Sequence, residues 1–287
     1  MLSLRTNAAS LNAQKSLASN QMALSDSMAK LSSGFRITKA SDDAAGLGVS
    51  AGLTAQVASY QQASRNANDG LSVTQTAEAA LNETTNILTR MRELAMQSSS
   101  DGISNTQRAD VQKETDALAG ELDRINATTE FNGTTLFGAA APLTFQVGIR
   151  ATANDFLTVD TTGMHTDSAS LGNGTNTIAD MKTGGAIDLA TSATQSRGAL
   201  AVIDAAIDAV SGDRATLGAV ANRLTSVLST ISQASESASE ANSRIRDVDV
   251  AEETANMSRS QILVQAGVSV LAQANQQPQI ALKLLGG

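Results

Sequence analysis

The chain has 287 residues with a formal charge of -8 at pH 7, and it contains no cysteine, no tryptophan and only 2% aromatic residues. This acidic balance argues against a nucleic-acid partner. The lack of cysteine excludes disulfides, thiolate metal sites and cysteine nucleophiles. Residues 1–10 carry no apolar run, and nowhere do 18 apolar residues follow one another. We therefore expect neither a cleaved signal peptide nor a membrane span.

Three apolar stripes at helical spacing occupy the first half of the chain, and each is typical of a long helix with one buried face. The stripe nearest the N-terminus comprises Leu17, Leu24, Met28, Leu31 and Phe35. The second comprises Ala77, Leu81, Thr84, Leu88, Met91 and Ala95, and the third Val111, Thr115, Leu118, Leu122 and Ile125. We predict one helix for each stripe.

Glycine marks a change of structure in the middle of the chain, because nine of the 21 glycines lie between residues 133 and 198. Apolar side chains there alternate with polar or small ones over Leu143, Phe145, Val147 and Ile149, and then over 157–159. This period of two predicts a small β-hairpin.

Helical spacing returns after the hairpin, with an apolar residue at every seventh position. These residues are Ile203, Val210, Leu217, Leu224, Ile231, Ala238 and Ile245. They predict a helix from about residue 199 to 245, which would be about 70 Å long. A last stripe comprises Val250, Met257, Val264, Val268 and Leu271. Neither end helix has a local partner, so we expect the two ends to pair with each other.

The predicted fold is therefore mainly α, a long antiparallel helical bundle or coiled coil formed by both chain ends, with a small β-hairpin region in the middle. We divide the chain into the N-terminal half of the paired coiled coil (1–40), the N-terminal part of a helical domain (41–137), a hairpin with a short variable surface segment (138–197), the C-terminal helix of that helical domain (198–243) and the C-terminal half of the coiled coil (244–287).

Few residues of the chain are candidates for catalysis or for binding a metal or cofactor. His165 is the only histidine and lies in the glycine-rich middle, so we expect no catalytic residue, no metal site and no cofactor. The glycines at 46, 48 and 52 follow no predicted strand, which favours helix packing over phosphate binding. Asp42 and Asp43 precede a predicted helix at Ala44, where carboxylates are typical N-terminal caps.

Both ends of the chain resemble bacterial flagellin, here in a short form without large outer domains. The N-terminal motifs are residues 31–37 (LSSGFRI), 41–47 (SDDAAGL), 68–70 (NDG) and 75–78 (QTAE). The C-terminal motifs are residues 243–247 (SRIRD), 256–259 (NMSR) and 269–276 (SVLAQANQ). The resemblance covers about residues 1–150 and 198–287.

The resemblance implies a structural protein that polymerises with copies of itself into the extracellular flagellar filament, the propeller for swimming. It implies export without a signal peptide through the flagellar type III apparatus. Further implied partners are an export chaperone, the filament cap and the hook–filament junction proteins.

The resemblance implies that the paired chain ends form an inner coiled coil and that the other long helices form a shell around it. We assign the apolar stripes to these two roles. Inner coiled-coil assembly falls to Leu17, Leu24, Met28, Leu31, Phe35, Met257, Val264, Val268 and Leu271. Shell packing falls to Leu81, Leu88, Met91, Leu118, Leu122, Ile125, Leu217, Leu224 and Ile231. The export-chaperone segment includes Ile262, Val264, Val268 and Leu271, and the patch for the vertebrate flagellin-sensing Toll-like receptor includes Arg90, Leu94 and Glu114.

Two other functions remain open at this point. A hook–filament junction protein would share the helical ends and the export route, although the motifs at 68–78 and 269–276 favour flagellin. A secreted enzyme built around the glycine-rich middle would have to work with one histidine and no cysteine.

Overall fold

The computed structural model describes residues 7–138 and 141–285, and the side chains of 277–285 are not described. The helices are α1 (Ala8–Ser33), α2 (Ala44–Ser98), α3 (Asn105–Thr128), α4 (Ala193–Arg246) and α5 (Val250–Leu285). The described residues divide into two compact units, one within 7–57 and 236–285 and one within 58–138 and 141–235. Long α-helices from both chain ends and a small β region confirm the predicted fold class.

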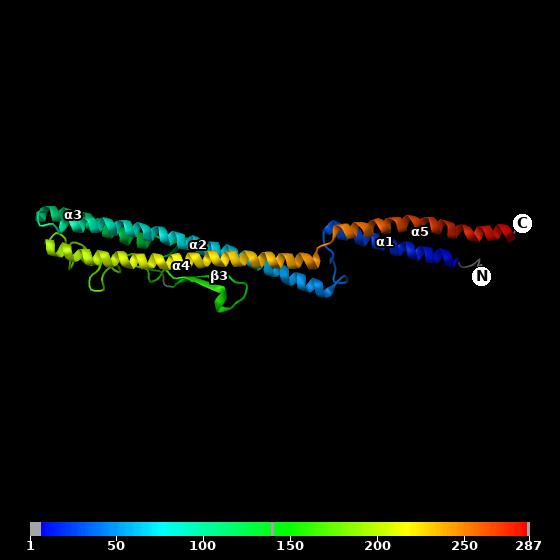
Figure 1. Ribbon diagram of the computed structural model, residues 1–287, viewed down its shortest axis with the longest axis horizontal. Coiled ribbons are helices and arrows are strands. Elements are labelled where there is room, and N and C mark those ends of the chain that lie inside the picture. The colour runs from blue at the N-terminus through cyan, green and yellow to red at the C-terminus, as the bar shows by residue number, and fades with distance from the viewer. Residues whose placement is uncertain (1–6, 139–140, 286–287) are drawn as a thin grey trace. The chain divides into compact units, whose positions relative to one another are not determined.

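In the first unit, α1 and α5 lie side by side (Figure 1) and run antiparallel, so that Asn7 at the start of α1 donates a hydrogen bond to the carbonyl of Ala274. Apart from Lys30, the less exposed residues of α1 recur at alternating steps of three and four. They are Ser10, Ala13, Leu17, Asn20, Leu24, Ser27 and Leu31. The matching α5 residues are Glu253, Met257, Ser260, Val264, Gly267, Leu271 and Ala274. This spacing is that of a two-helix coiled coil, and the predicted pairing of the chain ends is confirmed.

The end of α1 is fixed by a left-handed residue and a short two-strand contact. Gly34 has a φ of 75° and caps α1 through its N–H to the Lys30 carbonyl. Next to it, the Arg36 N–H donates to the Arg246 carbonyl at 2.6 Å, and the Val248 N–H to the Gly34 carbonyl at 3.0 Å. The two segments that leave α1 and enter α5 are thereby joined through their backbones.

The predicted carboxylate cap of α2 is present in one of the two aspartates. Asp43 accepts a hydrogen bond from the Gly46 N–H at 2.8 Å, as an N-terminal cap does. Asp42 instead accepts the N–H groups of Thr38 and Lys39, both at 3.0 Å. These bonds lower the pKa of Asp42, and the residue stabilises the preceding turn.

The second unit is built on a core shared by α2, α3 and α4. The predicted stripes are buried there, with Leu81, Leu88, Met91, Leu122, Leu217 and Leu224 all 0% exposed. Ile125 and Ile231 are 6% exposed, and Leu118 packs against the cluster while half-buried. Three helices therefore exclude water from one continuous apolar core.

Two short hairpins cross this unit. Strands β1 (Glu130–Phe131) and β2 (Thr134–Thr135) pair antiparallel, as do β3 (Leu143–Gln146) and β4 (Phe156–Val159). The β3–β4 register pairs Leu143 with Val159 and Phe145 with Leu157, which confirms the predicted hairpin. Phe145 packs over Gly70 of α2, where a Cβ would lie only 3.2 Å from the Phe145 ring.

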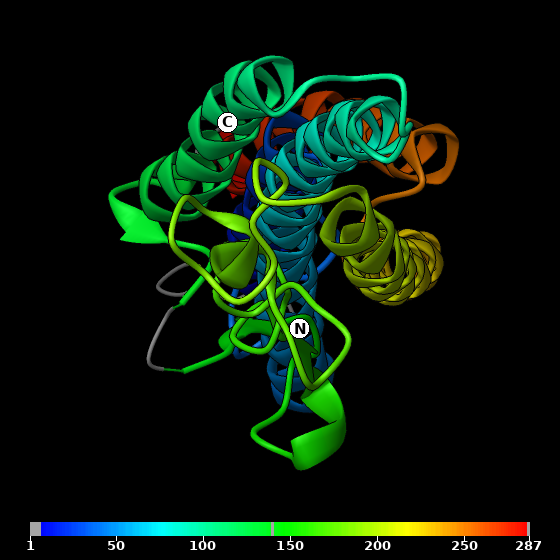
Figure 2. The same ribbon diagram turned by 90° about the vertical axis from the view of Figure 1, so that its left-hand side faces the viewer.

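The segment between β4 and α4 is folded onto the core, although the sequence suggested only a short surface segment. Figure 2 shows this yellow-green segment along one side of the helices. Its apolar side chains are buried at 0–9% exposure: Met164, Leu171, Ile178, Met181, Ile187 and Leu189. Its only regular element before α4 in the described structure is the short 3-10 helix η2 (Ile178–Met181).

Candidate assembly and recognition surfaces

The α1–α5 pair carries large apolar side chains that point away from its own seam. On α1, Leu11 is 56% exposed, Met22 67% and Met28 54%; on α5, Val250 is 62%, Ile262 66%, Leu263 44%, Val268 52% and Val270 54%. Met28, Val250 and Val268, which the sequence placed in the end stripes, thus lie outside the α1–α5 seam. So much exposed apolar surface is typical of an interaction site.

Little charge interrupts this surface on α5. After Arg259 the only charged residue of the chain is Lys283. The amide side chains of Gln261, Gln265 and Gln273 occupy the polar positions instead. Because amides carry no net charge, identical copies of this part of α5 can approach with little like-charge repulsion. The outer faces of α1 and α5 form what we call the terminal apolar surface.

A second candidate surface lies on α2 and α3 in the other unit. Arg90 of α2 forms ion pairs with Glu114 of α3 at 2.9 Å and with Glu93 at 3.0 Å. Hydrogen bonds, that to Glu114 first, raise the pKa of Arg90. The Arg90 and Glu114 side chains are about half exposed. Leu94, by contrast, is 2% exposed and belongs to the core.

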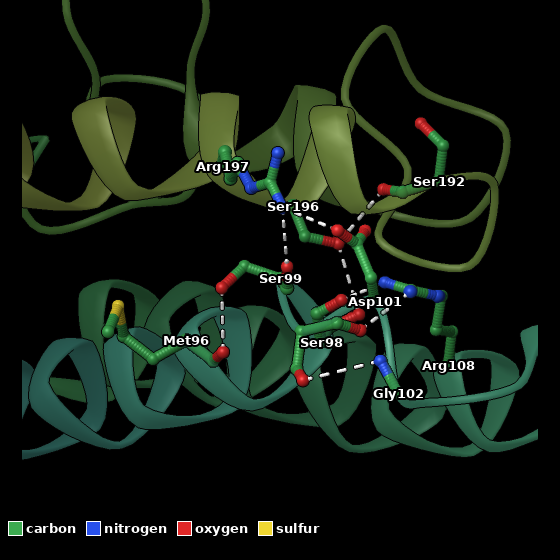
Figure 3. Close-up of polar contacts among 10 residues, drawn as sticks. Met96, Ser98, Ser99, Asp101, Gly102, Arg108, Ser192, Ser196 and Arg197 are labelled. Atoms are coloured by element: carbon green, nitrogen blue, oxygen red, sulfur yellow. Dashed lines mark hydrogen bonds and ion pairs between the residues drawn. The ribbon is translucent and has the colours of Figure 1, made fainter.

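The α2–α3 turn is held by a buried polar cluster (Figure 3). Arg108 of α3 is 4% exposed, and its guanidinium donates to the carbonyl of Ser98 and, at 2.8 Å, to that of Ser100. Ser98 is the last residue of α2, where a cation is favoured by the helix dipole, and Ser100 follows in the turn. On the other side, Arg197 of α4 donates to the Ser99 carbonyl at 3.3 Å and to Asp101 at 3.2 Å.

The same cluster ties the glycine-rich segment to the helices. Gln112 of α3 is 2% exposed, accepts the Leu189 N–H at 2.8 Å and donates to the Met181 carbonyl at 2.6 Å. The Ser196 hydroxyl of α4 donates to the Ser98 hydroxyl at 3.0 Å. Sequence reasoning missed Arg108 and Gln112. Their positions in the sequence carried a signal. Arg108 lies one helical turn before Val111 and Gln112 lies next to it, so both share the buried face of α3 with Thr115 and Leu122.

The single histidine makes a tertiary contact with α4. His165 contacts Asp213 of α4 through its backbone N–H at 2.8 Å and its Nδ1 at 3.0 Å. This contact fastens the segment after β4 to α4. Within residues 7–138 and 141–285, no group of three or more His, Asp or Glu side chains is arranged to hold a metal ion. In that same part of the chain, no helix has the length and apolar character needed to cross a bilayer.

Comparison with known proteins places these features in a family context. The family model for the bacterial flagellin N-terminal helical region matches residues 4–141, and that for the C-terminal helical region matches residues 200–285. Flagellin of Bacillus subtilis is 40% identical, with 97% of this chain and 98% of the relative covered. Flagellin of Halalkalibacterium halodurans is also 40% identical, with the same shares covered. A crystal structure of Bacillus cereus flagellin is 28% identical with a TM-score of 0.47, covering 58% of this chain and 88% of that one.

Proposed function

Since this chain belongs to the bacterial flagellin family, we propose that its subunits join through the terminal apolar surface of α1 and α5. As a flagellin, the protein is a structural subunit that polymerises into the extracellular flagellar filament, and it is not an enzyme. Nothing in the comparisons favours a hook–filament junction protein.

The exposed apolar side chains of this surface carry the assembly proposal. Eight large hydrophobic residues on α1 and α5 are 44–67% exposed in the single chain. Burying one such side chain completely contributes about 1.5–3 kcal/mol, so even partial burial of eight of them favours association strongly. Six other assembly residues lie in the α1–α5 seam and keep the pair together: Leu17, Leu24, Leu31, Met257, Val264 and Leu271. Phe35 instead follows the end of α1, where the Arg246 guanidinium lies 4.0 Å from the centroid of its ring.

Seeded polymerisation of the purified full chain, followed by sedimentation and electron microscopy, tests this proposal. Replacing Met22 and Ile262 by Gln should raise the critical concentration, because each change removes apolar area without adding charge. The matched control replaces the same two residues by Leu, which keeps the surface apolar. Equal polymerisation of the Gln and Leu variants would contradict the proposal. A chain lacking residues 1–40 and 245–287 should form no filament.

We assign Ile262, Val264, Val268 and Leu271 to the export chaperone as a continuous segment of α5. Val264 and Leu271 lie in the α1–α5 seam, whereas Ile262 and Val268 are exposed. A chaperone that holds all four must therefore separate α1 from α5. Deleting residues 257–287 should abolish binding in a pull-down with the flagellin chaperone, and retained binding would refute the assignment. Export through the type III apparatus and growth beneath the cap complete this proposal.

We also propose that the vertebrate flagellin-sensing Toll-like receptor recognises a surface patch that includes the exposed Arg90–Glu114 pair. Leu94 is 2% exposed, so Leu94→Ala would disturb the core and confuse a receptor assay. The charge-swapped double variant Arg90→Glu with Glu114→Arg keeps an ion pair while inverting the pattern that a receptor meets. We expect it to retain its helical content and lose activation of receptor reporter cells. An unchanged response would remove this assignment.

A further inference from the structure

Methionine is almost the only side chain of this protein that hydrogen peroxide can oxidise. The chain has eight methionines but no cysteine, no tryptophan, one tyrosine and one histidine. In proteins with thiols, low-pKa exposed cysteines react first. Here no thiol competes, so the thioethers receive the oxidant, and their exposure decides which of them react.

The structure divides the methionines sharply by exposure. Met91 and Met181 are 0% exposed and Met164 is 9%, all in the core of the second unit. Met22, Met28 and Met96 are 67%, 54% and 52% exposed. Met22 and Met28 lie on the terminal apolar surface of α1, whereas Met96 lies on α2, close to the α2–α3 turn (Figure 3).

We propose that Met22 and Met28 are oxidation sites through which hydrogen peroxide converts the unassembled subunit into an assembly-incompetent form. The inference rests on the proposed function of the terminal apolar surface. It concerns the exported subunit before it joins the filament, because assembly would then bury both side chains.

The chemical step is a transfer of one oxygen atom. With hydrogen peroxide, the thioether sulfur lone pair attacks one peroxide oxygen and the O–O bond breaks. The sulfur is oxidised by two electrons to the sulfoxide, and the other oxygen leaves as water after taking the remaining proton. The product replaces a flexible apolar side chain by a polar one, a change that disrupts methionine-containing interfaces.

The effect on assembly follows from the polarity of the sulfoxide oxygen. If this oxygen is buried in a subunit interface without a hydrogen-bond donor, the cost raises the critical concentration by about tenfold per site. Met96, with nearly the same exposure as Met28, serves as an internal control for chemical reactivity. Met257 lies in the α1–α5 seam and is half-buried. Its oxidation is an alternative cause of lost assembly, which the experiment must distinguish from oxidation of Met22 and Met28.

The experiment treats the full-length monomer with graded hydrogen peroxide, quantifies each sulfoxide by peptide mass spectrometry and measures the critical concentration for seeded polymerisation. We expect Met22, Met28 and Met96 to react before Met91 and Met181, and the critical concentration to rise with oxidation. When treated with the same dose, a variant with Met22→Leu and Met28→Leu should keep the critical concentration that it has without peroxide. A Met96→Leu variant treated with the same dose should show the same rise in critical concentration as the unsubstituted chain. Methionine sulfoxide reductases with dithiothreitol should restore polymerisation.

Three results would overturn the inference. They are unchanged polymerisation of chain oxidised at Met22 and Met28, an equal loss in the double Leu variant, and unreacted Met22 and Met28 at doses that oxidise Met96. An equal loss in the double variant would point to Met257. If the untreated chain itself fails to polymerise on seeds, the proposed function fails first, and this result is distinguishable because it requires no oxidant.

Discussion

Arg108 shows at the residue scale how a buried charge can be accommodated without a carboxylate partner. In the described part of the chain its guanidinium donates to the main-chain carbonyls of Ser98, the last residue of α2, and of Ser100 in the following turn, and its Nε has no partner. The last carbonyls of a helix have no partner within the helix. A cation placed there satisfies them and interacts favourably with the helix dipole.

Replacing Arg108 should therefore destabilise the α2–α3 turn. We expect Arg108→Met to lower the free energy of unfolding by about 2–3 kcal/mol, since it removes the charged donor of the buried Ser98 carbonyl. The control is Arg197→Met, whose side chain is 56% exposed and whose loss should cost less than about 1 kcal/mol. Urea denaturation followed by circular dichroism measures both, and equal losses would contradict a special role for Arg108.

Asp123 links the segment after β4 to α3 in a pH-dependent way. Burial alone would raise the pKa of Asp123, but the hydrogen bonds from Lys182 at 2.7 Å and the Ser168 N–H at 2.8 Å outweigh it and lower the pKa below the usual value. A carboxyl group with a lowered folded pKa stabilises the fold above its unfolded pKa, and this contribution is lost as the pH falls through the folded pKa.

We therefore expect Asp123→Asn to reduce stability at neutral pH by up to about 1 kcal/mol, a modest value because the pair is partly exposed. The difference between the two proteins should stay constant from pH 7 to about pH 4 and shrink below it, where the unsubstituted carboxyl is protonated. Urea denaturation at a series of pH values measures this difference. A gap that widened in acid would show that the ion pair is not its source.

At the scale of elements, the periodicity of apolar residues in the sequence was sufficient to predict the long helices and the β3–β4 hairpin. Seven-residue spacing from Ile203 to Ile245 and alternation at 143–149 reflect local geometry, which a sequence exposes directly. The segment 160–192 was not predictable in this way, because its buried residues follow no helix or strand period. Arg108 and Gln112 were also missed, since their burial depends on carbonyls of other elements rather than on their own polarity.

The segment between β4 and α4 should contribute to stability as a core layer does. Leu171→Ala is expected to lower the free energy of unfolding by about 2–4 kcal/mol, because the side chain is 0% exposed and its removal leaves a cavity. Phe156→Ala on β4 removes a larger side chain that is 46% exposed, and it should cost less. Thermal unfolding of the two variants compares them. A smaller effect at Leu171 would show that this segment only covers the surface.

At the scale of the whole molecule, the charge of the chain opposes the association that its apolar residues drive. Each subunit carries a formal charge of -8 at pH 7 and has a sequence pI near 4.7. Like charges on neighbouring copies repel over about 10 Å at 0.1 M ionic strength and over about 30 Å at 0.01 M. The terminal apolar surface itself carries little charge, so this repulsion arises mainly outside it.

Added salt should therefore lower the critical concentration for polymerisation. Going from 0.01 to 0.15 M sodium chloride shortens the screening length to about 8 Å and weakens repulsion between subunits, while apolar contacts persist. Sodium sulfate at the same ionic strength should lower the critical concentration further, because sulfate also strengthens apolar burial. Sedimentation of seeded samples measures both effects. A critical concentration that rises with sodium chloride would mean that complementary charges across the subunit contacts, rather than apolar burial against net repulsion, hold the filament together.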